Sequence, residues 1–283
     1  MRHLMVFTFA LAATAGAFAD SAKTEMRIVF IAYQNPEQII EDVEPVVEYL
    51  QDALGVPIKP FVATSYAGVV EALRNQTADA GFMGPLQYVI AHRHAGAIPI
   101  LGEMYQGQPY YHSRIFVRKD SGITSLEGLK GKTIAFTDPI SSSGYLYPAD
   151  VFRDAGLFDS RPEDFFRRVY FAGGDEQAIR AVHNGFVDAA GISEFSYNLL
   201  RAEERDEIVS IAESEPLPSH CVVVRKGLPE PQREALKQAL LALNESDPNG
   251  LLKLLYGVDG YVEVSHEDFA SVEEKAVDFG ILE

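Results

Sequence analysis

Apolar, strand-like runs alternate with helical patterns along this chain. Residues 26–33 (MRIVFIAY) are almost uniformly apolar, as in a buried strand, whereas residues 36–55 repeat apolar side chains at helical spacing. Pro45 should bend that helix. The pattern then predicts a strand, a helix and a strand at residues 57–63, 65–77 and 78–84. This βαβαβ order is typical of a mostly parallel sheet covered by helices.

The middle of the chain repeats this order. It predicts strands at residues 132–138, 167–173 and 188–193 and helices at residues 142–155 and 175–185. Residues 72–88 align with residues 181–197 at a constant offset of 109, with identities that include Asp79 with Asp188. Such a match arises by coincidence or from two copies of an α/β half. We interpret it as two similar lobes, each with its own sheet.

Two further runs with a shared ending flank the second half. Residues 110–120 and 220–229 both contain Val-Arg-Lys, and we interpret them as paired crossing strands between the lobes. The signal peptide aside, this predicts a first lobe of residues 20–113 plus 222–283 and a second lobe of residues 114–221. Such a layout leaves a ligand cleft between the lobes.

The first 19 residues have the composition of a secretory signal peptide. A short basic start precedes an apolar run and the sequence Ala17-Phe18-Ala19, which predicts cleavage after Ala19. A membrane anchor is the alternative, but the run is shorter than the roughly 20 apolar residues that a span needs. We therefore expect an exported, soluble protein without direct membrane insertion.

Composition excludes several classes of function. The 283 residues carry a formal net charge of -17, which argues against nucleic acid partners and anionic membrane surfaces. A single cysteine, Cys221, rules out an intrachain disulfide. The sequence has no G-x-S-x-G, HExxH, P-loop or GxGxxG motif, and its histidines lack metal-ligand spacing. We therefore expect no enzyme activity, cofactor or metal.

Three serines and a glycine, residues 141–144, stand at the start of the helix predicted at residues 142–155. A helix N-terminus offers unpaired N–H groups and a partial positive charge, to which Ser141, Ser142 and Ser143 add hydroxyl donors. Gly144 would permit close approach, so the segment predicts an anion cradle. An ordinary helix cap is the alternative. Pro148, in the following turn, should distort the helix.

Four segments of the chain together resemble the periplasmic phosphonate- and phosphite-binding proteins of ABC transporters. They are TDPISSSGYLYP, GFMGPLQYV, VRKDSGITSLEGLKGKTIAF and LPSHCVVVRKGLP. The resemblance implies a type II binding protein, an α/β fold whose two lobes are joined by two crossing strands and close on a small phosphorus oxyanion. It implies a periplasmic protein, expected to be a monomer, that delivers its ligand to a permease. A sensory subunit that presents an oxyanion of phosphorus or arsenic, such as arsenite, to a histidine kinase is the alternative.

The resemblance also implies which residues contact the ligand. The family's contacts fall on Tyr66, Tyr111 and the hydroxyls of Ser141, Ser142 and Ser143.

Two further positions depart from the family's pattern. Asp175 stands where such proteins usually have His, and His220 stands where they usually have Asp. An exchanged pair would let a protonated oxyanion donate to Asp175 while His220 donates to another oxygen; otherwise either residue caps a turn. Glu194 is expected to face the cleft from the second lobe and to pair with a ligand amine or bind only water. Cys221 is either a small buried side chain or a contact for a thiophilic anion.

Overall fold

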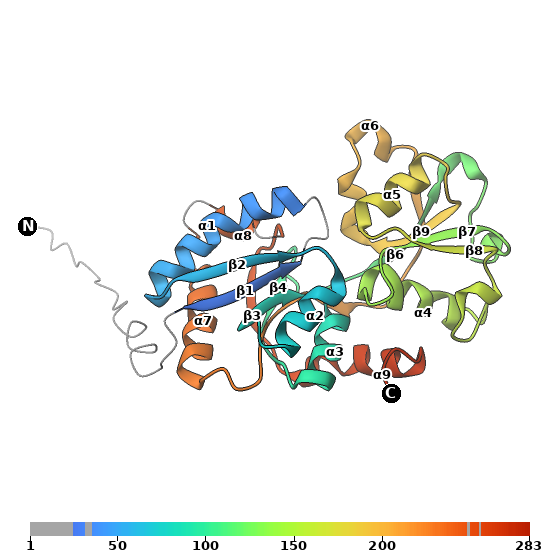
Figure 1. The fold of residues 1–283 in the computed structure, drawn as a ribbon. Helices are drawn as coiled ribbons and strands as arrows, with labels where there is room; N and C mark the ends of the chain where they lie inside the picture. Colours follow the sequence, from blue (N-terminus) through green and yellow to red (C-terminus); the bar gives the residue numbers. More distant parts are fainter. Residues whose placement is uncertain (1–24, 32–35, 248–249, 255) are drawn as a thin grey trace, which may run out of the picture.

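The chain folds around two main sheets (Figure 1). The structure, a computed structural model, describes residues 25–31, 36–247, 250–254 and 256–283, so the predicted signal peptide lies outside the described residues. The first sheet has six strands in the order β13-β4-β12-β3-β1-β2. They are β1 (Met26–Ile31), β2 (Ile58–Ala63), β3 (Ala80–Met83), β4 (Ile98–Met104), β12 (Cys221–Val224) and β13 (Gly260–Glu263).

The second sheet has five strands in the order β10-β6-β9-β7-β8. They are β6 (Ser113–Arg118), β7 (Thr133–Phe136), β8 (Arg168–Phe171), β9 (Ala189–Ser193) and β10 (Ile208–Glu213). Two short strands, β5 (Tyr110–Tyr111) and β11 (Leu217–Pro218), pair antiparallel on the two segments that connect the sheets.

Helices cover both faces of each sheet. Around the first sheet lie α1 (Pro36–Leu54), α2 (Tyr66–Arg74), α3 (Pro85–Ala95), α7 (Glu230–Ala242), α8 (Leu251–Leu254) and α9 (Ala270–Asp278). Around the second lie α4 (Tyr147–Asp154), α5 (Asp175–His183) and α6 (Ala202–Arg205). We call each sheet with its helices a lobe. None of the described helices has the length and apolarity that a membrane crossing requires.

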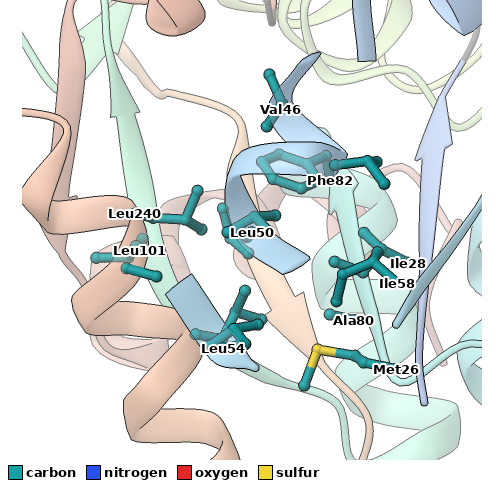
Figure 2. Packing of buried hydrophobic residues seen from close by; sticks show 14 of the residues in the cluster. Met26, Ile28, Val46, Leu50, Leu54, Ile58, Ala80, Phe82, Leu101 and Leu240 are labelled. Atoms are coloured by element: carbon teal, nitrogen blue, oxygen red, sulfur yellow. The ribbon is translucent and has the colours of Figure 1, made fainter. Parts of the chain in front are cut away.

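The core of the first lobe forms because α1 presents one apolar stripe to the sheet. Figure 2 shows Val46, Leu50 and Leu54 of α1 packed against Ile28 and Phe82 of the strands. Each fully buried side chain of this size contributes about 1.5–3 kcal/mol relative to an exposed one. With no disulfide available, this burial stabilises the lobe.

The structure confirms that the two sheets repeat one another. The order β8-β7-β9-β6-β10 follows the pattern of β2-β1-β3-β12-β4, with the same parallel and antiparallel pairs. The aligned aspartates occupy one place in the pattern: Asp79 accepts a hydrogen bond from the Arg27 N–H of β1, and Asp188 accepts one from the Thr133 N–H of β7.

The expected pairing of the runs at residues 110–120 and 220–229 is wrong in detail. Their main strands, β6 and β12, belong to different sheets, where each is the antiparallel neighbour of β9 or β3. The shared Val-Arg-Lys ending reflects this equivalence, and the strands that do pair between the sheets are β5 and β11. Near the predicted boundaries, Ser113 pairs with a strand of the second sheet and Cys221 with a strand of the first. The exact lobe boundaries stay a prediction.

The lobes also touch along α9. This helix packs on α3 of the first lobe, and its Lys275 forms an ion pair with Asp150 of α4 in the second. Arg153 of α4 bonds Asp278 at 3.3 Å and lies over the Phe279 ring. The two lobes are therefore in direct contact at α9 as well as at the connecting segments.

Candidate functional site

A cavity of about 400 Å³ lies between the two lobes. Seven of the eight predicted site residues line it: Tyr66, Tyr111, Ser141, Ser142, Ser143, Asp175 and His220. The structure thus brings these residues together from both lobes and from the connecting strand β5.

The starts of several helices meet at this cavity. Tyr66 is the first residue of α2, Gly84 caps α3, Ser142 begins the turn that leads into α4, and Asp175 is the first residue of α5. Helix N-termini carry partial positive charge and N–H groups without helical partners, so their convergence favours an anion. Among the described residues that line the cavity, Lys253 is the one Lys or Arg, and it pairs with Asp259.

The serine segment is both a helix cap and a contact between lobes. The Ser141 hydroxyl accepts from the Gly144 N–H at 3.0 Å, which is an N-cap bond. The Ser142 hydroxyl accepts from the Leu86 N–H at 2.8 Å, so a residue of the second lobe satisfies an N–H in the first turn of α3. Because each oxygen accepts these bonds, each hydroxyl hydrogen can still be donated to a ligand.

Pro148 distorts the start of the helix, as predicted. Residues Ser142–Leu146 form a π-helical turn ahead of α4, and the Leu146 N–H bonds Ser141 O at 3.1 Å. Pro148 has no N–H to donate to the preceding turn. The carbonyls of Ser143 and Gly144 instead accept from the Ser113 hydroxyl and from the Thr137 N–H.

Gly144 is required by the neighbouring strand end rather than by a ligand. A Cβ at this position would lie 2.1 Å from Thr137 Oγ1 and 2.8 Å from Ser141 Oγ. Gly144 thus permits a close approach of Thr137, while its expected role in admitting an anion stays a prediction.

Asp175 presents a fixed carboxylate to the cavity. Its two oxygens accept from the hydroxyls of Thr137 and Ser196, each at 2.6 Å. These bonds hold its orientation and leave further acceptor capacity, because a carboxylate has about four lone-pair sites. A ligand that meets Asp175 therefore needs a hydrogen to donate.

Two tyrosine hydroxyls add neutral donors. Burial raises the pKa of both Tyr66 and Tyr111, and the Asp175 charge adds to the rise, so both phenols stay protonated near neutral pH. The buried Tyr111 hydroxyl has no hydrogen-bond partner among the described residues; the Ser143 hydroxyl moderates its pKa but lies outside hydrogen-bond geometry. Leaving a buried donor unpaired costs about 1–3 kcal/mol, which a ligand oxygen would recover.

His220 lies between the cavity and a buried glutamate. Its Nδ1 is 3.6 Å from Oε2 of Glu103, and its side chain lines the cavity beside Gly84. Tyr105 donates its hydroxyl to the same Glu103 oxygen at 2.6 Å.

The structure corrects the expectation that Glu194 faces the cleft. Glu194 is not among the cavity residues; its carboxylate accepts from the His112 N–H at 2.9 Å and pairs with Arg114 at 3.2 Å. Cys221 is fully buried and is not among the cavity residues, and burial raises the pKa of its thiol well above its usual value. That protonated thiol, bonded to the Met83 carbonyl, is a packing residue rather than a contact for a thiophilic anion.

Sequence reasoning missed several cavity residues. Gln87 accepts from the Gly84 N–H at 2.6 Å and donates to the Tyr66 carbonyl at 3.3 Å, so it ties two helix starts together. The glutamine three residues after Gly84 supplies one half of a capping box, and this spacing is the local signal that could have found it. Tyr105 and Phe195 form an aromatic wall with ring centroids 5.1 Å apart, and no local signal indicates either.

Tyr256 closes one end of the cavity from an unusual backbone conformation. Its φ of 64° is in the left-handed region, and its hydroxyl bonds the Ile31 backbone at 3.1 and 3.2 Å. Such strain persists where surrounding contacts enforce it.

Within the described residues no group of three or more His, Cys, Asp or Glu could hold a metal ion.

Comparison with known proteins supplies a family. Residues 28–269 match the family model described as "ABC transporter, phosphonate, periplasmic substrate-binding protein". The chain is 30% identical over 178 residues to the phosphate-import protein PhnD of Mycolicibacterium smegmatis, covering 60% of this chain and 56% of that one. It is 28% identical over 229 residues to the phosphonates-binding periplasmic protein of Escherichia coli, covering 78% and 66%. The chain thus spans less than two thirds of either relative.

A solved structure shows the same fold. PhnD1 of Prochlorococcus marinus, determined in complex with methylphosphonate, superposes with a TM-score of 0.81 at 19% identity. The match covers 92% of this chain and 99% of that one. This likeness confirms the predicted bilobal α/β architecture.

Proposed function

Because the chain belongs to the family of periplasmic phosphonate-binding proteins of ABC transporters, we propose that it binds a small phosphonate- or phosphite-type oxyanion and delivers it to a permease. The lobes would close on the ligand by a hinge motion at the connecting segments that carry β5 and β11. The family description gives no support to the sensory alternative.

One observation carries the ligand class: a fixed carboxylate stands among neutral donors at converging helix starts. Tyr66, Tyr111 and the serine hydroxyls can donate to oxyanion oxygens, while Asp175 can only accept while ionised. A monoprotonated phosphonate or phosphite offers both kinds of oxygen. A fully ionised sulfate offers no hydrogen to Asp175 and leaves two negative charges facing each other.

The size of the cavity supports an organic phosphonate over a bare oxyanion. At about 400 Å³ it falls within the range of small-molecule sites, about 300–1,000 Å³. The serines occupy one part of its wall, and Phe195, Leu199 and Tyr256 offer apolar surface for a short substituent. Because the Glu194 carboxylate is already paired, an amine on that substituent gains nothing from it.

Calorimetric titration against a ligand panel tests the proposal. The panel is phosphite, methylphosphonate, aminoethylphosphonate, phosphate and arsenite, with sulfate as the control anion without a proton. We expect binding of at least one phosphonate or phosphite and none of sulfate. Binding of sulfate alone, or of no member of the panel, would contradict the proposal.

Export is part of the same proposal. The predicted cleavage after Ala19 leaves a mature chain that begins at Asp20. N-terminal sequencing of protein from the periplasmic fraction should start at or near Asp20. Retention of Met1 there would contradict cleavage.

A further inference from the structure

We propose that Gln87 is a further ligand-binding residue, whose side-chain amide donates an N–H to the bound oxyanion from the first lobe. The inference rests on the proposed function, because it adds a donor to the anion site described there. Gln87 is the third residue of α3 and lines the cavity, and it is buried from bulk solvent with an exposed fraction of 1%.

The orientation of the Gln87 amide follows from its two partners. Its Oε1 accepts from the Gly84 N–H at 2.6 Å, and its Nε2 donates to the Tyr66 carbonyl at 3.3 Å. A backbone N–H needs the amide oxygen and a backbone carbonyl needs the amide nitrogen, so a flipped amide would lose both bonds. The side chain is therefore held between the starts of α2 and α3.

The amide nitrogen of Gln87 has a second hydrogen to give. A primary amide carries two N–H donors, and among the described residues Nε2 has one acceptor, the Tyr66 carbonyl. A buried N–H without an acceptor is destabilising. A ligand oxygen in the cavity that Gln87 lines would satisfy it.

The backbone at the start of α3 has little left to offer a ligand. The Gly84 N–H bonds Gln87, and Pro85 has no N–H. The Leu86 N–H bonds the Ser142 hydroxyl at 2.8 Å. Gln87 accepts one of these bonds and can return an N–H to the cavity, so its amide relays hydrogen bonding from the helix start to the ligand. The bond at Oε1 strengthens the donor at Nε2, because hydrogen bonds in a chain polarise one another.

Neighbouring contacts place this amide beside the serine segment. Leu86, next to Gln87 in the first turn of α3, holds the Ser142 hydroxyl. The carbonyl of Tyr66 bonds Gln87, while the Ser141 hydroxyl moderates the pKa of the Tyr66 phenol. We therefore expect an anion held by these serines to lie within reach of Gln87 Nε2.

Gln87→Met is the direct test, because it keeps an unbranched side chain of similar length but removes both polar groups. We expect methylphosphonate affinity to fall about ten- to a hundredfold, the effect of losing a hydrogen bond to a charged group. Gln87→Glu keeps an acceptor for the Gly84 N–H but, when ionised, has no hydrogen to donate, and should lose at least as much. Calorimetric titration measures both variants.

NMR separates donation to the ligand from the tie between helix starts. The side-chain amide signals of Gln87, assigned through the backbone of α3, should respond to saturation with methylphosphonate. One hydrogen should move downfield and exchange more slowly with solvent. An amide that only ties Gly84 to Tyr66 would keep its signals, because those two bonds do not involve the ligand.

Gln232 is the matched control. It is a buried glutamine of α7 in the same lobe and is not among the cavity residues. Gln232→Met should leave methylphosphonate affinity unchanged, and the side-chain amide signals of Gln232 should not respond to the ligand.

The results distinguish the donor role of Gln87 from the proposed function. If the wild type binds methylphosphonate, either unchanged Gln87 signals or wild-type affinity in Gln87→Met overturns the donor role and leaves the proposed function standing. If the wild type binds sulfate alone, the proposed function fails, and a response of the Gln87 signals to sulfate would still support the donor role. Binding of no anion in the panel overturns both. Should Gln87→Met fail to fold, the NMR titration of the wild type decides.

Discussion

Tyr66 in the first lobe and Asp175 in the second hold the same place in the repeat, 109 residues apart. Each is the first residue of a helix, and each lines the cavity. One is a neutral phenol that can donate, and the other is a carboxylate whose oxygens accept from Thr137 and Ser196. One scaffold position thus carries two chemistries, and a ligand between the lobes meets a donor on one side and an acceptor on the other.

The scaffold aspartates show the opposite relation. Asp79 accepts from β1 and Asp188 from the equivalent strand β7, yet Asp79 is fully buried and bonds the Arg225 guanidinium at 2.8 Å. Asp188 instead accepts from the Thr133 hydroxyl at 2.7 Å. Both lobes keep the aspartate, but its expected contribution to the free energy of unfolding differs between them.

The largest effect should come from breaking this pair of aspartates one at a time. Asp79→Ala leaves Arg225 without its buried partner and should lower the free energy of unfolding by about 3–5 kcal/mol. Asp188→Ala removes the hydrogen bonds that the carboxylate accepts from the uncharged donors of Thr133 and should cost about 1–3 kcal/mol. Urea denaturation monitored by circular dichroism measures both; equal losses would show that the lobes do not differ in this way.

The pH dependence of Asp188 sharpens the same comparison. Burial alone would raise its pKa, but bonds from Thr133 and the charges of Lys132 and Arg167 hold it below its usual value. A lowered folded-state pKa gives stability above the unfolded pKa, near 3.9, that is lost as pH falls through the folded value. Asp188→Asn should therefore flatten the loss of stability below about pH 4. An unchanged dependence of the unfolding free energy on pH below about pH 4 in Asp188→Asn would contradict this prediction.

The next effect concerns the serines that follow the Ser141 cap in the second lobe, compared with the Ser65 cap in the first. Replacing Ser142 and Ser143 together with Ala removes two donors to a charged ligand, each worth about 1.5–3 kcal/mol, so affinity should fall at least about a hundredfold. The loss of the Ser142 bond to Leu86 also weakens closure. Ser65→Ala, which removes the cap of α2, is the matched control. Calorimetry with methylphosphonate should show near wild-type affinity in that control. Wild-type affinity in the double variant would mean that the Ser142 and Ser143 hydroxyls do not bind the ligand.

Local chemistry made much of the site predictable. A strand followed by serines, a glycine and a proline specified the cap and the distorted turn, because these depend on neighbours within a few residues, while the anion cradle stays a prediction. The carboxylate and imidazole at Asp175 and His220 followed from the family's pattern. The repeat at offset 109 predicted two sheets, because Asp79 and Asp188 serve the same strand junction.

Contacts made across the fold were not predictable. Glu194 carries a charge next to a cavity strand, but its fate depends on His112 and Arg114, about 80 residues earlier in the chain. Glu103 belongs to an apolar strand, and its contact with His220 could not be predicted because it forms only when β12 pairs with β4. The helix α3 also escaped prediction: it is buried over most of its length, so its sequence lacks a clear polar face.

A smaller effect should come from the glycines of the two caps. Gly144 and Gly68 each donate their N–H to the capping serine three residues earlier. A Cβ on Gly144 would lie 2.1 Å from Thr137, whereas one on Gly68 would meet Ser65 Oγ at 3.1 Å. Gly144→Ala should therefore cost about 1–3 kcal/mol of stability through forced backbone shifts, and weaken ligand binding with it. Gly68→Ala should cost less than half as much, by thermal denaturation of both variants; a reversed order would show that the turn at Gly144 yields easily.

The smallest effect should come from the strap between the lobes. Lys275 of α9 pairs with Asp150 of α4 and, at 3.1 Å, with Glu215 on a connecting segment, so it stabilises the closed form. Lys275→Met keeps the alkyl chain but removes these pairs. Asp150 is buried but keeps Arg153 as an ion-pair partner, and the pair with the exposed Glu215 is worth about 1 kcal/mol or less. Ligand must then supply that free energy to close the lobes, so affinity should fall no more than about fivefold. Lys237→Met is the matched control, because Lys237 pairs with Glu234 and Glu263 inside the first lobe. Calorimetry should show unchanged affinity for the control, and small-angle scattering should show a larger ligand-free radius of gyration for Lys275→Met alone. Equal radii and equal affinities in the two variants would mean that α9 packs beside α4 without holding the lobes together.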